Sequence, residues 1–270
     1  MATIVPDPAL ADTRHNPFET SELAMVRRLE AAGFRAWPAA SVHYDGTWVI
    51  RLTAGLAAKR LNSVNPLDPG DVSNIEDRIG RAMRRFDAYG RPLVFRMTPL
   101  GGERLSAHLD GLGWTRYSES LVMAVRLSDE LVAPVMDQIP LRDVGRYVTA
   151  ALRIRGAEPS TRAGLTEVIG AIEPEAGLFV HESAGSAVAT GICVHDGELA
   201  GLFEIATDPA ARGRGHARQL VLSALRWARG RGAVYGWLQV EADNAPAIAL
   251  YRSLGFEECY RYHYRSLPDA

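Results

Sequence analysis

The 270-residue chain has no marked excess of charge of either sign and no long apolar run. It holds 30 basic and 32 acidic residues, a formal net charge of -2, so no overall positive field would attract a nucleic acid. No apolar run approaches the ~20 residues that span a bilayer. Residues 1–16 do not combine a basic start with an apolar segment, so no secretory signal is expected. These absences predict a cytoplasmic protein with neither a nucleic-acid nor a membrane partner.

The sequence also has few cysteines and no cluster of histidines. The two cysteines, Cys193 and Cys259, stand in apolar, strand-like surroundings, where buried free thiols are expected. They form neither a disulfide framework nor a metal-ligand spacing. His181, His195 and His263 are isolated from one another and show no metal-ligand pattern, so we expect no metal.

The patterns that are present alternate between helical and strand periods, which predicts an α/β (α+β) fold. The local predictions include a helix over residues 21–32 that ends at Gly33, a hairpin across Asp45-Gly46, a strand over residues 59–64, and a helix over residues 73–89 with Ser73 as its N-cap. Residues 1–17 contain three prolines and are expected to form a flexible tail. The segment 95–114 aligns without a gap on the segment 237–256, which indicates an internal structural repeat. The expected units are therefore residues 18–128 and residues 129–270.

A basic turn rich in glycine follows the apolar segment 198–207 and leads into a helix predicted for residues 215–229. Glycine permits positive φ, and the free amides of such a turn and of a helix start form an anion site. The residues expected to bind phosphate or pyrophosphate are Arg212, Gly213, Arg214, Gly215, His216, Ala217 and Arg218. The corresponding first-half stretch, residues 67–72, has two aspartates and no arginine, so no second anion site is expected.

Other interpretations of this turn are weaker. Gly213 and Gly215 also fit part of a dinucleotide-binding pattern, but Arg218 replaces its third glycine. The arginine–glycine pairs alone do not indicate RNA binding in a chain with balanced charge.

Two motifs in the second half resemble the GNAT superfamily of N-acetyltransferases. The first is Arg/Gln-x-x-Gly-x-Gly/Ala, which residues 212–217 match after a strand end at Asp208-Pro209. The second, Asn-x-x-Ala-x-x-Leu-Tyr followed by Gly-Phe, is matched by Asn244, Ala247, Leu250, Tyr251, Gly255 and Phe256. The resemblance covers the chain from about residue 141 onwards. Residues 18–128 more weakly resemble the degenerate N-terminal half of tandem GNAT proteins.

The resemblance implies two GNAT-like domains, each with a mixed central sheet flanked by helices, of which only the second binds CoA. It also implies acetyl-CoA as co-substrate, transfer to a primary amine and no metal. The edge of the strand at Ile205, Ala206 and Thr207 is expected to pair with the pantetheine amides, which requires this strand to splay from the next one. A backbone N–H at Ile205 or Ala206 would then hold the thioester oxygen.

Proton transfer needs two further groups. Glu204, a carboxylate in an otherwise apolar strand, is the first candidate for the base that deprotonates the amine. A structural salt bridge of Glu204 with an arginine is the competing interpretation, and Glu241 or a water relay are the other candidates for the base. The resemblance implies that Tyr251 is the acid that protonates the CoA thiolate. The competing interpretation is that Tyr251 is only a packed aromatic side chain.

Asn244 is expected to cap the helix that carries Tyr251, and contact with CoA would be additional. The acceptor is expected to be a small-molecule or peptide amine that attacks directly in a ternary complex. Tyr260, Tyr262 and Tyr264 suggest an aromatic wall for it, although tyrosine is also an ordinary strand residue. The alternative function is a non-catalytic acyl-CoA sensor. A monomer or a homodimer is expected.

Overall fold

The computed structural model describes residues 22–268, so the predicted tail at residues 1–17 lies outside the described residues. Ten strands form one mixed sheet in the order β1-β2-β3-β4-β10-β5-β9-β8-β7-β6. Their bounds are β1 Ser41–Asp45, β2 Trp48–Leu52, β3 Ser63–Pro66, β4 Phe95–Met97, β5 Thr115–Arg126, β6 Glu175–Ser183, β7 Ser186–Asp196, β8 Leu199–Thr207, β9 Tyr235–Glu241 and β10 Glu257–Ser266.

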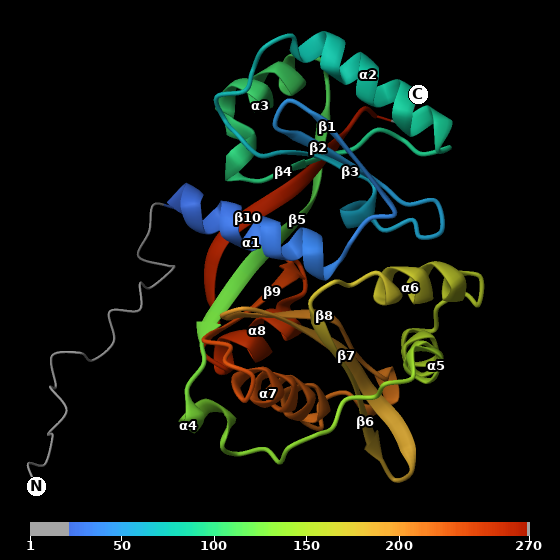
Figure 1. The fold of residues 1–270 in the computed structure, drawn as a ribbon, viewed down its shortest axis with the longest axis vertical. Helices are drawn as coiled ribbons and strands as arrows, with labels where there is room; N and C mark the ends of the chain where they lie inside the picture. Colours follow the sequence, from blue (N-terminus) through green and yellow to red (C-terminus); the bar gives the residue numbers. More distant parts are fainter. Residues whose placement is uncertain (1–21, 269–270) are drawn as a thin grey trace, which may run out of the picture.

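Helices lie on both faces of this sheet (Figure 1). One buried cluster joins α1, α5 and α6 to the sheet, and a second joins α7 and α8 to it. A third cluster packs α2 and α3 against β2, β3 and β4. The helical bounds are α1 Glu22–Ala36, α2 Ile75–Ala88, α3 Gly102–Gly111, α4 Asp129–Val132, α5 Val144–Arg155, α6 Thr161–Gly170, α7 His216–Arg229 and α8 Ala245–Ser253, with short 3-10 helices at η2 Lys59–Leu61, η3 Pro99–Gly101 and η4 Pro209–Ala211.

The two halves of the chain exchange their last strands. The last strand of the first half, β5, pairs with β9, whereas the last strand of the second half, β10, lies between β4 and β5. In Figure 1 these two long strands run from the upper to the lower part of the molecule. The sequence predicts a sheet in each half, and the structure joins the strands of both halves in a single sheet.

Several local predictions are confirmed and several are wrong. The turn at Asp45-Gly46 joins β1 to β2 as predicted, with Gly46 at φ 59°. A helix end at Gly33 is wrong, because α1 continues to Ala36 with Gly33 packed against Trp237. A strand beginning at Lys59 is also wrong. Residues 59–61 form η2, and the strand begins only at Ser63.

The start of α2 also differs from prediction. Its N-cap is Asn74, in the left-handed region at φ 51°, and not Ser73.

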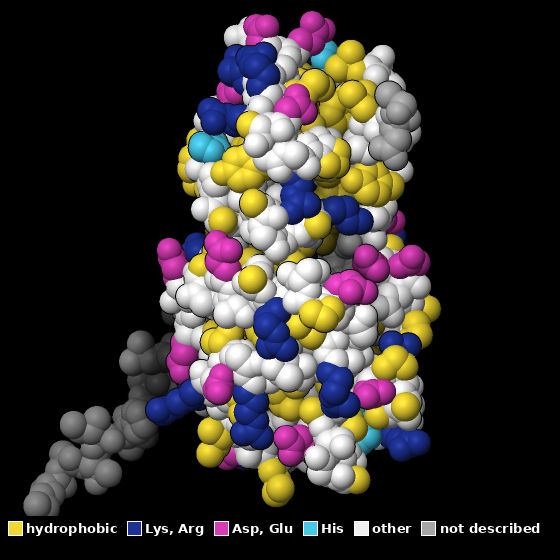
Figure 2. Space-filling view, turned by 90° about the vertical axis from the view of Figure 1, so that its right-hand side faces the viewer, with side chains coloured by type: hydrophobic (Ala, Val, Ile, Leu, Met, Phe, Trp, Pro, Cys, Tyr) yellow, Lys and Arg dark blue, Asp and Glu magenta, His cyan; other side chains and the backbone are white. Residues whose placement is uncertain are grey.

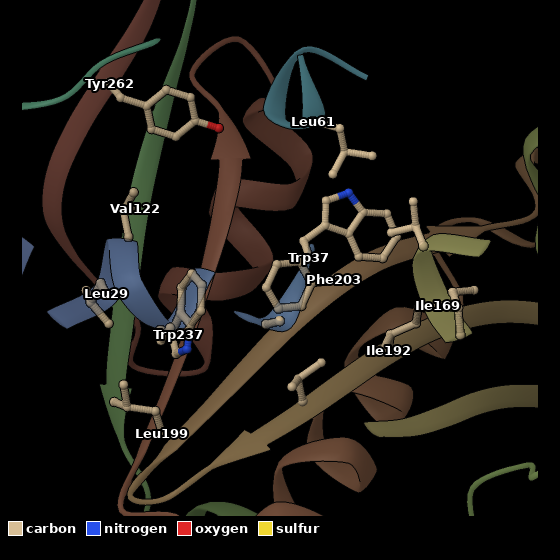
Figure 3. Packing of buried hydrophobic residues seen from close by; sticks show 14 of the residues in the cluster. Leu29, Trp37, Leu61, Val122, Ile169, Ile192, Leu199, Phe203, Trp237 and Tyr262 are labelled. Carbon is tan, nitrogen blue, oxygen red and sulfur yellow. The ribbon is translucent and has the colours of Figure 1, made fainter. Parts of the chain in front are cut away.

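Aromatic side chains fill the core where α1 and the second half meet. Trp37 stacks on Phe203 at a centroid distance of 5.9 Å, and Phe203 meets Trp237 edge to face at 5.5 Å (Figure 3). A buried ion pair joins Glu30 of α1 to Arg96 of β4, and the Tyr260 hydroxyl donates to Glu30 over 2.7 Å. The first helix is thus fixed to elements of both halves, so the two halves share one core.

No helix within residues 22–268 is long and apolar enough to cross a membrane.

Candidate active site

A gap opens between the central strands β8 and β9. The two strands pair in parallel only from Leu199 opposite Tyr235 to Leu202 opposite Leu238, although β8 continues to Thr207 and β9 to Glu241. The predicted splay is therefore confirmed. On its other side, β8 stays paired with β7 as far as Thr207. The edge of Ile205, Ala206 and Thr207 that faces β9 is left without a strand partner.

A β-bulge marks the start of this gap. On β8, Glu204 and Ile205 lie opposite the single residue Gly191 of β7, and Glu204 has a φ of 55°. A Cβ on Gly191 would lie 2.4 Å from Cδ1 of Ile205, so a larger residue there would require the Ile205 side chain to shift. Positive φ at a non-glycine residue costs about 1–3 kcal/mol and is typical of functional sites. The bulge turns β8 away from β9.

A cavity of about 400 Å³ occupies the gap. Its lining includes Tyr251 of α8, which packs in the same buried cluster as α7. It also includes Tyr262 and Tyr264 of β10, which belong to the cluster of α1, α5 and α6. The cavity therefore reaches both faces of the sheet through the split between β8 and β9. Figure 2 shows a recess at mid-height on the side that carries α5 and α6.

Glu204 lines this cavity and is ion-paired. One carboxylate oxygen contacts the Arg155 guanidinium at the end of α5, and the other lies 3.8 Å from Nη2 of Arg60 in η2. Its side chain is 14% exposed. The salt bridge expected as the competing interpretation is thus present, and the carboxylate also faces the cavity, as a base would have to. Glu241 lines the same cavity, and no ion pair of Glu241 is found within residues 22–268.

Tyr251 of α8 and its N-cap residue Asn244 also line the cavity. Burial raises the pKa of Tyr251 to about 12, so the phenol keeps its proton at neutral pH. No hydrogen bond of its hydroxyl is found among the described residues. The Asn244 side chain accepts from Ala247 N over 3.2 Å, which confirms the predicted cap.

The basic turn leads from η4 into α7 with its amides exposed. Gly213 and Gly215 have φ values of 74° and 80°, as their predicted positive-φ role requires. The first α-helical bond is that from Gln219 N to Gly215 O. Within residues 22–268, no hydrogen bond is found for the amides of Gly213, Arg214, Gly215, His216, Ala217 and Arg218. Such a set of free amides at a helix start fits an anion.

Side chains around this turn are arranged unevenly. Arg212 and Arg214 are exposed, whereas Arg218 donates to Ser253 Oγ over 3.1 Å and so links α7 to α8. His216 lies 5.2 Å from His181 of β6, ring centroid to ring centroid. Desolvation, and then the neighbouring His216, lowers the pKa of His181. Near neutral pH His181 therefore adds no positive charge to this surface.

The structure adds lining residues that the sequence patterns missed. Lys59 and Arg60 come from η2, Ser118 and Ser120 from β5, and Arg155 from α5. Of the three tyrosines expected as an aromatic wall, Tyr262 and Tyr264 line the cavity, and Tyr260 instead bonds to Glu30 in the core. Within residues 22–268, no group of three or more His, Cys, Asp or Glu side chains is placed to hold a metal.

Comparisons with known proteins agree with this geometry. The family model described as "Probable histone acetyltransferase Rv0428c C-terminal" matches residues 20–265. The "Uncharacterized N-acetyltransferase YobR" of Bacillus subtilis is 24% identical over 89% of this chain and 98% of its own length. A "Mycothiol acetyltransferase" of Thermomonospora curvata is 32% identical over 64% of this chain and 67% of its own.

A solved structure has the same fold. A "GCN5-related N-acetyltransferase from Kribbella flavida" superposes with a TM-score of 0.67 at 20% identity, over 90% of this chain and 96% of that one. The splayed strands, the open turn before α7 and the family match over residues 20–265 agree on one conclusion: the chain belongs to the "Probable histone acetyltransferase Rv0428c C-terminal" family and is a GNAT-type N-acetyltransferase.

Proposed function

We propose that the protein transfers the acetyl group of acetyl-CoA to a primary amine of a small molecule or peptide, by direct attack in a ternary complex. The observation that carries this proposal is that the unpaired edge of β8, Glu204 and Tyr251 all line one cavity. The names of the relatives point to different acceptors, so they support the reaction and not a particular substrate.

In this proposal the open turn binds the CoA pyrophosphate through the amides of residues 213–218, with Arg212 and Arg214 adding charge. Arg218 contributes from the first turn of α7, and Asn244 contacts CoA from α8. The pantetheine arm lies along the free edge of Ile205, Ala206 and Thr207. The N–H of Ile205 or Ala206 then holds the thioester oxygen, where such a donor contributes about 3–4 kcal/mol in the transition state.

The acceptor amine loses a proton to a carboxylate, attacks the thioester carbon, and expels the CoA thiolate, which takes a proton from Tyr251. Its raised pKa keeps the phenol protonated for this role. Glu204 is the first candidate for the base, since it faces the cavity, and its contacts with Arg155 and Arg60 fix the position of the carboxylate. Glu241 and a water relay are the alternatives. A larger loss of kcat in Glu204→Gln than in Glu241→Gln would favour Glu204, and the reverse would favour Glu241.

We also propose that residues 129–270 form the catalytic unit and that residues 18–128 form a GNAT-like unit without a CoA site. This proposal predicts one CoA per chain, and a calorimetric stoichiometry of two would contradict it. The cytoplasmic location and the monomeric or homodimeric state stay predictions.

Thiol release from acetyl-CoA with a panel of amines tests the activity directly. Release that depends on both the amine and the protein, together with the acetylated amine in a mass spectrum, is the expected result. CoA binding with no release for any amine would instead favour the acyl-CoA sensor.

A further inference from the structure

One side chain of the cavity is chemically unlike every other in the protein. Lys59 is the only lysine in the 270-residue sequence, beside 29 arginines, and it lines the cavity. Its Nζ donates to Ser118 Oγ over 2.6 Å and lies 5.1 Å and 5.0 Å from the ring centroids of Tyr117 and Tyr264. A compact ammonium approaches both neighbouring rings at once more readily than a planar guanidinium that is built for bidentate contacts.

Lys59 also has donors to spare. An ammonium has three N–H donors, and Ser118 takes one of them. No other hydrogen bond and no ion pair of Lys59 is found within residues 22–268. By contrast, Arg60 and Arg155 share the carboxylate of Glu204. Among the basic side chains that line the cavity, Lys59 is therefore the one whose charge no carboxylate matches in the described part of the chain.

The backbone beneath Lys59 is strained in the same way as the backbone at Glu204. On β5, Ser118 and Glu119 lie opposite the single residue His263 of β10, and Ser118 has a φ of 47°. Among residues 22–268, only Ser118 and Glu204 are non-glycine residues within strands that have positive φ, and both line this cavity. Strain of this kind persists where a site requires it. The bulge at Ser118 positions the hydroxyl that accepts the hydrogen bond from Lys59.

We propose that Lys59 binds a carboxylate of the acceptor, so that the substrates of this site are small amines that also carry a carboxylate, such as amino acids. This inference rests on the proposed N-acetyl transfer. The lining holds three basic side chains, Lys59, Arg60 and Arg155, against two acidic ones, Glu204 and Glu241. An acceptor with an anionic group matches that balance, whereas a polyamine would add positive charge to a positive wall.

The rim of the recess is consistent with such an acceptor. Figure 2 shows basic side chains above the recess and acidic side chains below it. A molecule with both an amine and a carboxylate meets an opposite charge on each side. The cavity, at about 400 Å³, has the size of a small-molecule site.

Matched acceptor pairs test the proposal. Thiol release is measured with glycine, L-leucine and L-phenylalanine and with the corresponding carboxamides, for the wild type and for Lys59→Met. Since an amide's amine is less basic than that of the free acid, the variant is compared with the wild type within each acceptor. We expect Lys59→Met to lower kcat/KM for the free acids about ten- to hundredfold, the effect of one lost charged hydrogen bond. For the amides we expect less than about a threefold change, with the KM for acetyl-CoA unchanged.

Two control variants accompany it. Lys59→Arg keeps the charge but not the compact shape, so it should lose less of the preference for acids than Lys59→Met does. Arg116→Met removes a nearby charge that does not line the cavity and should change neither class of acceptor. An equal loss for acids and amides in Lys59→Met would overturn the proposal. An acetyl group found on Lys59 itself would also overturn it, because Lys59 would then be an acceptor.

A binding measurement separates this inference from the activity. Calorimetry in the presence of CoA should show the N-acetylated acids binding the wild type about tenfold or more tightly than they bind Lys59→Met. N-acetylated acids that bind no better than their amides would overturn the role of Lys59. Absence of thiol release with every acceptor, while this binding difference persists, would instead contradict the proposed transfer alone.

Discussion

Two of the turns that lead from a strand into a helix carry side chains of opposite charge. In residues 67–74, which lead from β3 to α2, Asp68 Oδ1 accepts from Gly70 N, and Asp68 O accepts from Asp71 N. Asp71 in turn accepts from Thr47 N over 2.8 Å and from the Arg78 guanidinium. In residues 208–215, which lead from β8 to α7, Asp208 makes the same two bonds, since its Oδ1 accepts from Ala210 N and its O accepts from Ala211 N. The two turns therefore differ in their side chains and not in these hydrogen bonds: Asp68 and Asp71 make the first acidic, whereas Arg212 and Arg214 make the second basic.

The helices that follow repeat the difference. The first turn of α2 carries Glu76 and Asp77, whereas the first turn of α7 has no acidic residue and begins with His216. Negative side chains at a helix start neutralise the positive end of its dipole, so α2 has no need of an external anion. Side chains, and not the strand–turn–helix topology, distinguish the turn proposed to bind an anion from the one that is not.

The largest effect on activity is expected at Tyr251, the proposed general acid. Tyr251 of α8 aligns in sequence with Leu109 of α3, which is fully buried and has no polar group. We expect Tyr251→Phe to lower kcat about a hundredfold or more while CoA affinity stays the same. Because its pKa is raised to about 12, ionisation of Tyr251 should not lower wild-type kcat below about pH 11. Unchanged turnover in steady-state assays would remove Tyr251 from the mechanism.

The turn that leads into α7 is tested by introducing a carboxylate, as the turn at residues 67–74 has. Gly215→Asp places a carboxylate among the free amides and forces a side chain into φ 80°. We expect the Kd for CoA, measured by calorimetry, to rise about a hundredfold, since several charged hydrogen bonds are lost. Gly113→Asp is the matched control, with φ 78° and open space around it. Gly113→Asp should lower the Tm by a similar amount and leave the Kd for CoA unchanged. If both variants have a similar Kd for CoA, the turn before α7 does not bind CoA.

The turn at residues 67–74 should affect the stability of the fold and not the affinity for CoA. Its hydrogen bond from Arg78 is the main reason that the pKa of Asp71 is lowered to about 2. We expect Asp71→Asn to lower the free energy of unfolding by about 1–3 kcal/mol at neutral pH. A carboxyl whose folded pKa is depressed stabilises above its unfolded pKa, so the difference should disappear as the pH falls from about 4 to about 2. Urea unfolding measures it, and a change in CoA affinity would contradict the comparison.

The smallest effect is expected at the cap of α8. Asn244 caps α8, whereas the aligned residue in the first half is Gly102, which has no side chain to do so. We expect Asn244→Ala to lower the free energy of unfolding by about 1 kcal/mol. Ser128→Ala removes a similar cap at α4 and serves as control. A rise in the Kd for CoA in Asn244→Ala but not in Ser128→Ala would show that Asn244 also contacts CoA.

Features encoded locally could be predicted from the sequence. Asp45-Gly46 predicted a hairpin because its turn needs positive φ, and Gly213 and Gly215 predicted the open turn for the same reason. The cap at Asn244 follows from its position before a helical run. Each of these depends on residues only a few positions apart.

Features that depend on distant partners could not be predicted. The helix α1 continues through Gly33 because Trp237 packs there, about 200 positions along the chain. Neither Ser118 nor Glu204 has a side chain that favours positive φ, so the sequence does not indicate the two bulges. Lys59 meets Ser118 only because η2 folds against β5, and its one available signal was that no other lysine occurs in the sequence.

The exchanged strands have a consequence for biosynthesis. During synthesis β4 and β5 leave the ribosome more than a hundred residues before β10, which lies between them in the finished sheet. The strands β4 and β5 therefore lack their shared neighbour until β10 has been synthesised. Such non-local pairing is slow, and strand edges left open in the meantime are prone to aggregation. Expression yield should then depend on chaperones that shield β4 and β5 during this delay.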